Sequence, residues 1–188
     1  LKDFRNVTGR LGGAARLKWQ NEEFDGGATL RLDGIGGETD DALVDGISGT
    51  IALDNLFPLS TAPDQRLRIR KIAAGVIAED ASIRFALLPS GVLSIGRAEA
   101  RLADGKVIIV APAIDPVAET AQAVMTLEGV RLEQIPGLGK VEGFEATGLI
   151  DGSLPIRLTG SKIAIDGGLL AARGGGLLRL KSERAEQV

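Results

Sequence analysis

The chain has 188 residues, of which 44% are hydrophobic and 25% charged, and its formal net charge is −3. This acidic balance disfavours nucleic-acid binding, which needs a basic surface. The absence of Cys and His excludes a disulfide framework, a thiol nucleophile, a Cys/His zinc site and a Ser-His-Asp triad.

Apolar and polar residues alternate along most of the chain, as in Ala28–Asp33 and Ala81–Leu87. A period of two is typical of β-strands with one apolar and one polar face. Asp-Gly pairs recur between such segments, and this dipeptide suits hairpin turns that need a positive φ. The pairs are Asp25-Gly26, Asp33-Gly34, Asp45-Gly46, Asp104-Gly105, Asp151-Gly152 and Asp166-Gly167. The pattern predicts an all-β protein, a long antiparallel meander with a continuous apolar face.

The expected strands follow one another with short connections. In chain order they cover residues 15–20, 28–33, 44–53, 67–72, 77–87, 92–102, 106–111, 121–127, 144–150, 153–158, 162–165, 169–173 and 177–180. A leading segment at 1–12 holds a weak strand near Phe4–Val7, residues 21–27 form a polar turn, and 34–41 form a loop. Pro112 is expected to end the strand at 106–111.

Two segments depart from the alternation. Asn55–Pro63 is expected to be irregular, either a flap over one end of the sheet or a loop pinned by Leu56 and Phe57 packing inward. One short helix is expected near 131–135, before Pro136, with Leu132 and Ile135 on a common face.

The sharpest hairpin signal lies between the strands at 92–102 and 106–111. With Asp104 and Gly105 as the two loop residues, Leu102 and Val107 share one face. Ile108 and Val110 point the other way and are also apolar, which indicates a strand covered on both sides.

Residues 1–180 are interpreted as one β-domain, with a candidate sub-boundary at 136–143 and a charged tail at 181–188. The chain begins with Leu1, and it contains neither a signal peptide nor an apolar run near the roughly 18 residues of a membrane helix. We therefore expect an excised piece of a longer protein.

Sequence motifs for phosphate binding, calcium binding or catalysis are weak in this chain. The glycine runs at 34–37 and 174–176 do not join a strand to a helix, so they lack the dipole of a phosphate loop. The Asp-Gly pairs do not follow a calcium-binding repeat, and turn chemistry accounts for them. Adjacent carboxylates such as Asp40 and Asp41 point apart and have no apolar surroundings. We expect no catalytic residue, no metal site and no cofactor.

The remaining feature is the aliphatic stripe itself. Its predicted members are Leu17, Trp19, Leu30, Leu32, Ile47, Ile51, Leu53, Ile69, Ile83, Phe85, Leu87, Leu93, Ile95, Val107, Ile109, Phe144, Ile150, Leu154, Ile156, Leu158, Ile163 and Ile165. One interpretation is an ordinary core in which two sheets seal each other, as in a structural or adhesive domain. The other is an open trough whose inner face holds acyl chains.

Three segments resemble the YdbH-like family, which belongs with the AsmA-like and TamB-like envelope proteins. They are Ile47–Gln65, Gly148–Leu158 and Ile163–Gly176, and the likeness covers most of residues 44–180. The resemblance implies a curled, taco-like sheet (a β-taco) with an aliphatic lumen that carries phospholipid between the inner and outer membranes of Gram-negative bacteria.

The same resemblance implies a non-enzymatic C-terminal domain in the periplasm, within a protein anchored in the inner membrane. The expected partners are phospholipid and envelope proteins at open sheet edges. The family also carries an older label, dicarboxylate transport, which would require clustered Arg or Lys in a desolvated pocket. Trp19 departs from the aliphatic pattern, either as a plug of the trough or as packing at one end.

Overall fold

The computed structural model describes residues 4–20, 23–118, 120–135, 144–159 and 162–180. Almost all regular structure in these residues is β-strand. The strands are β1 (Arg5–Gln20), β2 (Glu23–Glu38), β3 (Leu43–Leu56), β4 (Leu59–Thr61), β5 (Gln65–Ala74), β6 (Val76–Leu87), β7 (Leu93–Leu102), β8 (Gly105–Ile114), β9 (Thr120–Arg131), β10 (Phe144–Thr147), β11 (Leu149–Thr159), β12 (Lys162–Ile165), β13 (Leu169–Ala172) and β14 (Leu177–Leu180). The predicted sub-boundary at 136–143 and the tail at 181–188 lie outside the described residues.

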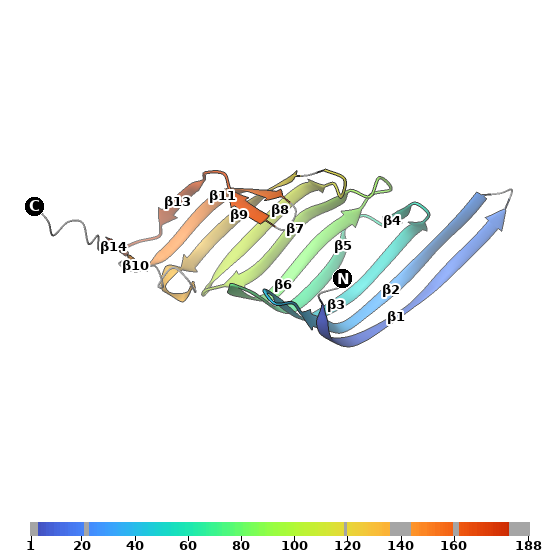
Figure 1. Cartoon of the computed structure of the whole chain (residues 1–188), viewed down its shortest axis with the longest axis horizontal. Coiled ribbons are helices and arrows are strands. Elements are labelled where there is room, and N and C mark those ends of the chain that lie inside the picture. The colour runs from blue at the N-terminus through green and yellow to red at the C-terminus, as the bar shows by residue number, and fades with distance from the viewer. Residues whose placement is uncertain (1–3, 21–22, 119, 136–143, 160–161, 181–188) are drawn as a thin grey trace, which may run out of the picture.

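One antiparallel sheet contains twelve of these strands, in the order β1-β2-β3-β5-β6-β7-β8-β9-β11-β12. Strand β4 pairs with β3, and β13 pairs with β11 beside β12. Each long strand therefore lies next to its predecessor in the chain, as Figure 1 shows. The predicted antiparallel meander is confirmed.

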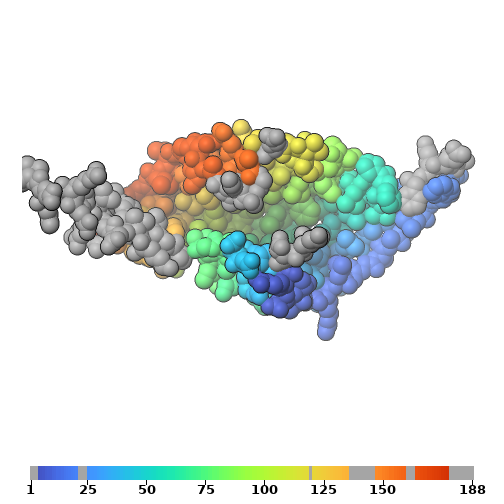
Figure 2. Space-filling model, viewed as in Figure 1, coloured from blue at the N-terminus to red at the C-terminus, as the bar shows by residue number. Residues whose placement is uncertain are grey.

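The sheet is a single curled layer. The outer edges of β1 at one end and of β12 and β13 at the other have no strand partner among the described residues, so the sheet does not close into a barrel. Figure 2 shows the resulting hollow, in which the green segments of β6 and β7 recede behind the orange segments of β11 and β13 and the blue segments of β1. The fold is therefore consistent with the curled, open trough that the family resemblance implies.

Strands β1 and β2 are longer than predicted. β1 includes most of the leading segment, and β2 continues through the glycines that were expected to form a loop at 34–41. Gly34 has a φ of +63°, and the pairing with β3 shifts register between Leu32 and Ile35. A glycine bulge therefore absorbs the irregularity, and the strand continues beyond it.

Most Asp-Gly pairs lie inside strands, which corrects the prediction that they mark hairpin turns. Asp25, Asp33, Asp45 and Asp151 are all strand residues. Gly46 has a φ of +74°, and the pairing of β9 with β11 shifts beside Asp151. The positive φ that Asp-Gly permits serves bulges as well as turns.

The hairpin between β7 and β8 turns one residue earlier than predicted. Ala103 and Asp104 are its loop residues, with φ of +47° and +62°, while Gly105 pairs with Leu102. Two consecutive positive φ values are typical of the two-residue turn that matches strand twist. Ile108 is 8% exposed, but Val110 on the same side is 38% exposed. No second large sheet covers that side among the described residues, so the expectation of a strand covered on both sides is not met.

Asn55–Pro63 is a short hairpin and not an irregular flap or loop. Leu56 pairs with Leu59, and Phe57 at the tip is 68% exposed, so it does not pack inward. Gln65 fastens this hairpin, since its buried side chain accepts a hydrogen bond from the Ala52 N–H at 2.7 Å and donates to the Ala62 carbonyl at 2.9 Å. The side chain thereby satisfies backbone groups where β3 changes partner.

Three further boundaries differ from expectation. β8 continues through Pro112, because the pairing with β9 already ends at Val110 and no ladder N–H is required there. Gly148, at φ +117°, separates β10 from β11. The expected helix is a single 3₁₀ turn at Leu132–Gln134.

Candidate functional site

The register of the sheet puts its aliphatic side chains on one face. Residues directly opposite each other in antiparallel strands project to the same side. Each opposite pair can therefore be followed from one strand to the next. A representative series is Leu30–Ile51, Gly49–Leu67, Leu67–Ile83, Ile83–Ala98, Ala98–Ile109, Ile109–Met125 and Met125–Leu154. We call this side the aliphatic face.

The backbone positions of all the predicted stripe residues except Phe144 fall on the aliphatic face. Phe144 belongs to β10, which pairs with β14 in a separate two-stranded sheet. The remaining predicted residues come from β1, β2, β3, β5–β9, β11 and β12, so the face runs across the large sheet.

The exposed fraction of the side chains on the aliphatic face increases from the middle of the sheet to its two ends. Ile69 and Ile156 are 7% and 8% exposed, although no second large sheet covers them among the described residues. Leu17 and Trp19 at the β1 end are 60% and 73% exposed, and Ile165 at the other end is 56% exposed. Side chains converge on the concave side of a curled sheet, so the aliphatic face is the concave one.

Small residues in the middle of the face are also buried, and the alternation does not predict them. Ala81, Ala100, Ala111 and Ala123 are between 1% and 8% exposed and belong to two packed clusters. Their small methyl groups pack beside larger neighbours such as Ile69, Ile83 and Ile156. Alanine is a weak hydrophobic signal, and only the cross-strand register reveals these positions. Other members of the face outside the predicted stripe include Leu67, Ala98, Leu102, Ile114, Ala121, Met125, Leu127, Val130 and Leu170.

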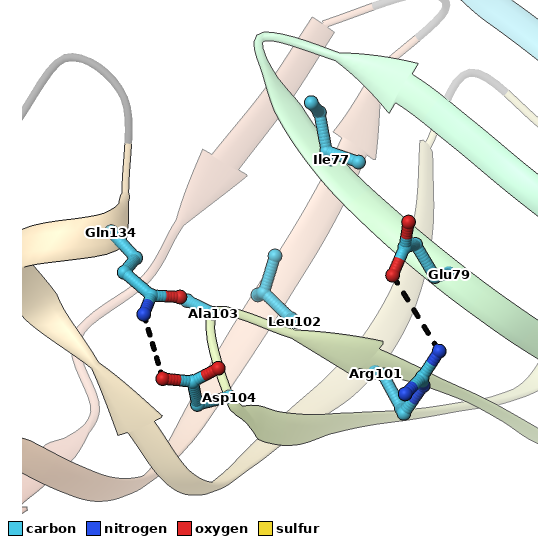
Figure 3. Close-up of a pocket in the computed structure, with 7 residues that line it drawn as sticks. All are labelled: Ile77, Glu79, Arg101, Leu102, Ala103, Asp104 and Gln134. Carbon is cyan, nitrogen blue, oxygen red and sulfur yellow. Dashed lines mark hydrogen bonds and ion pairs between the residues drawn. The ribbon is translucent and has the colours of Figure 1, made fainter.

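A polar hollow of about 440 Å³ lies at one rim of the trough, where β6, the β7–β8 turn and the 3₁₀ turn meet. Figure 3 shows Arg101 opposite Glu79 at 3.5 Å, and Gln134 donating to Asp104 at 2.6 Å. Leu102 lines the same hollow and also packs against the buried cluster of the aliphatic face. Charged and aliphatic surfaces therefore adjoin at this rim.

An ion pair at the far end of the sheet shifts two pKa values. The hydrogen bond from Arg173 lowers the pKa of Asp151. A second hydrogen bond, which the Gly129 N–H donates to Asp151 Oδ1 at 2.8 Å, lowers that pKa further. The same side-chain bond raises the pKa of Arg173. Hydrogen bonds from its own N–H and from the Gly148 N–H lower the pKa of Glu133. These groups lie at a strand junction and stabilise it.

Other kinds of site find little support. The described residues hold no group of three or more His, Cys, Asp or Glu side chains placed to bind a metal ion. No helix in the described ranges is long and apolar enough to span a membrane. The geometry that the chain does offer is a curved hydrocarbon surface with polar rims.

Comparison with known proteins gives one match. A model of the YdbH-like family, described as intermembrane phospholipid transport protein YdbH, matches residues 1–187. No curated protein and no solved structure matches the chain. The family description names transport and no reaction, which supports a lipid-transport role in general, a location in the cell envelope and phospholipid as the ligand.

Proposed function

The chain belongs to the YdbH-like family, and we propose that its concave aliphatic face binds phospholipid acyl chains and conducts them between two membranes. The role is non-enzymatic. The acyl chains lie along the trough, and the headgroups remain in water at its open side.

The observation that carries this proposal is an aliphatic face that crosses a single-layer sheet. A sheet in a soluble domain normally buries its apolar face against another layer. Here the second described sheet consists only of β10 and β14, with four residues each, which is too small to seal the large one. Hydrocarbon from a lipid can supply the missing layer.

The energetics favour an acyl chain as the guest. Burying one CH₂ group contributes about 0.8 kcal/mol, so roughly 16 carbons covered on one side gain on the order of 6 kcal/mol. Aliphatic side chains give no directional preference, so a chain can slide along the face. The charged rim around Arg101 and Asp104 suits a polar headgroup next to this surface.

We place the domain in the periplasm, at the C-terminal end of a protein anchored in the inner membrane. The free edges of β1 and of β12 and β13 then offer backbone groups for envelope proteins to pair with. β1 is suited to such pairing, because it has sixteen residues and is exposed along its whole length.

Ile109 and Val110 give a matched test. They are neighbours in β8, but Ile109 lies on the aliphatic face and Val110, 38% exposed, on the opposite one. Ile109→Asp should strongly reduce the phospholipid that co-purifies without detergent, because a carboxylate in the acyl path must be desolvated. Val110→Asp should retain it. Mass spectrometry of lipid extracts measures both.

Single cysteines separate lipid binding from folding. The chain contains no Cys, so Ile109→Cys and Val110→Cys can each be modified after folding with a charged thiol reagent. Modification at position 109 should displace bound lipid, and modification at 110 should not. Equal lipid retention after both modifications would show that the aliphatic face does not hold the acyl chains.

A further inference from the structure

Three arginines stand side by side on the convex face of the sheet. Arg66 of β5 lies directly opposite Arg84 of β6, which in turn lies directly opposite Arg97 of β7. Arg68 is two residues further along β5 and lies opposite Ser82. The sequence shows these residues only as separate members of alternating strands, and the register brings them together.

The charges in this arginine row are poorly compensated. Arg97 donates through Nε to Glu99 Oε2 at 3.0 Å. Arg66 and Arg84 form no hydrogen bond or ion pair with any residue that the structure describes. Among the described residues these three arginines thus have one carboxylate partner between them, Glu99, in a chain whose formal net charge is −3.

This arrangement has a cost for the folded protein. Cβ atoms of directly opposite residues are about 5 Å apart, and like charges at such positions are destabilising. A doubly charged anion between the guanidinium groups would reverse the sign of the interaction. The bond to Glu99 engages only the Nε side of Arg97, so its terminal NH₂ groups remain available to a ligand.

A hollow of about 250 Å³ accompanies the row. Its lining consists of Arg66, Ser82, Arg84, Arg97 and Glu99. The volume equals that of roughly eight water molecules, enough for one tetrahedral anion with part of its hydration. The Ser82 hydroxyl supplies a further donor beside the three guanidinium groups.

We propose that Arg66, Arg84 and Arg97 bind a phosphate group on the convex face. Planar guanidinium groups bind phosphate oxygens through paired hydrogen bonds. Three guanidinium groups on adjacent strands can donate hydrogen bonds to several oxygens of one phosphate. A carboxylate has only two oxygens, and the paired N–H groups of a single arginine can bind both. The phosphate comes either from the phosphomonoester headgroup of a lipid or from free phosphate. The site lies on the side opposite the aliphatic face and is independent of acyl-chain binding.

Arg84→Gln in the full chain tests the site, with inorganic phosphate titrated by calorimetry. The affinity for phosphate should fall by about tenfold or more, because the central guanidinium group and its paired N–H donors are lost. Arg84→Lys should restore affinity only in part, since it keeps the charge without the fork. Arg16→Gln removes the same charge from the convex face of β1, where Arg16 lies opposite Gly27, and should leave affinity nearly unchanged.

Thermal unfolding without phosphate gives a second readout. At low ionic strength Arg84→Gln should raise the melting temperature, because it relieves like-charge repulsion. Removal of an arginine with a merely structural role would lower the melting temperature instead.

Phosphatidylcholine vesicles with and without phosphatidic acid distinguish the two sources of the phosphate group, a lipid headgroup and free phosphate. Binding that requires phosphatidic acid and Arg84 identifies the lipid headgroup, and binding of inorganic phosphate alone identifies the free anion.

Three results would overturn the proposal. The first is that neither inorganic phosphate nor vesicles containing phosphatidic acid bind saturably to the wild-type protein. The second is that Arg16→Gln weakens phosphate binding as much as Arg84→Gln does. The third is that succinate binds at Arg84 as tightly as phosphate, which would assign the row to carboxylates.

Discussion

Gly105 sets how closely β8 can approach β9. A Cβ atom at this position would lie 2.5 Å from the backbone carbonyl carbon of Gly129. Gly105→Ala must therefore move one of two backbones, and we expect it to lower the free energy of unfolding by about 1–3 kcal/mol. Chemical denaturation followed by circular dichroism measures the change.

Gly96 is the matched control in the neighbouring strand β7. No heavy atom lies within 4 Å of a Cβ built there. Gly96→Ala should be neutral or stabilise the protein by up to about 1 kcal/mol through the unfolded chain. If Gly105→Ala proved as harmless as Gly96→Ala, the close approach of β8 and β9 would be wrong.

Side-chain direction within a strand could be predicted from the sequence, because alternation fixes it locally. The alternation predicts that Leu30, Ile83 and Ile156 lie on one face, and their backbone positions agree. Relations between strands could not be predicted, because register depends on bulges that alternation does not locate. The arginine row and the buried alanines both depend on that register, so both were missed.

At the scale of elements, an ion pair fastens β13 to the sheet. Arg173 donates to both carboxylate oxygens of Asp151, at 2.8 and 2.6 Å, and its backbone N–H donates to the Leu149 carbonyl at 2.7 Å. β13 has four residues, all exposed, and these bonds add to its backbone pairing with β11. The pair holds the last strand of the trough against β11.

This attachment should depend on pH. Because the folded-state pKa of Asp151 lies below its ordinary value of 3.8, its stabilising contribution is present above that pH and is lost as the pH falls through the lowered value. We expect the amide protection factors of Leu169–Ala172 to decrease in that acidic range. Hydrogen exchange followed by mass spectrometry measures them.

Arg173→Gln provides the comparison for this prediction. It should lower protection of β13 already at neutral pH and remove its dependence on pH, while β2 and β3 keep their protection. Protection of β13 that is the same in both proteins at every pH would mean that the ion pair does not hold the strand.

The type and order of elements could be predicted better than their ends. Most predicted strands exist, because alternation is a strong signal for a half-buried strand. Strand ends at Gly34–Gly37, Asn55–Pro63 and Pro112 were wrong. Glycine, proline and Asp-Gly interrupt pairing only in some registers, and the neighbouring strand decides which.

At the scale of the whole molecule, the protein is one curled layer with a hydrocarbon surface on its concave side. Alternation predicts such a surface but not whether a second sheet covers it, since both arrangements bury the same residues. The resemblance to the YdbH-like family favoured the open trough, and the single large sheet agrees with it. The role of the individual aliphatic residues in holding lipid stays a prediction.

The most direct test uses a phospholipid that carries a photoreactive group within its acyl chain. After irradiation of the protein–lipid complex, peptide mass spectrometry locates each cross-link. The account predicts cross-links to residues of the aliphatic face, such as Leu30, Ile109 and Leu158, and none to their convex neighbours Arg31, Val110 and Thr159. Cross-links spread equally over both faces would contradict it.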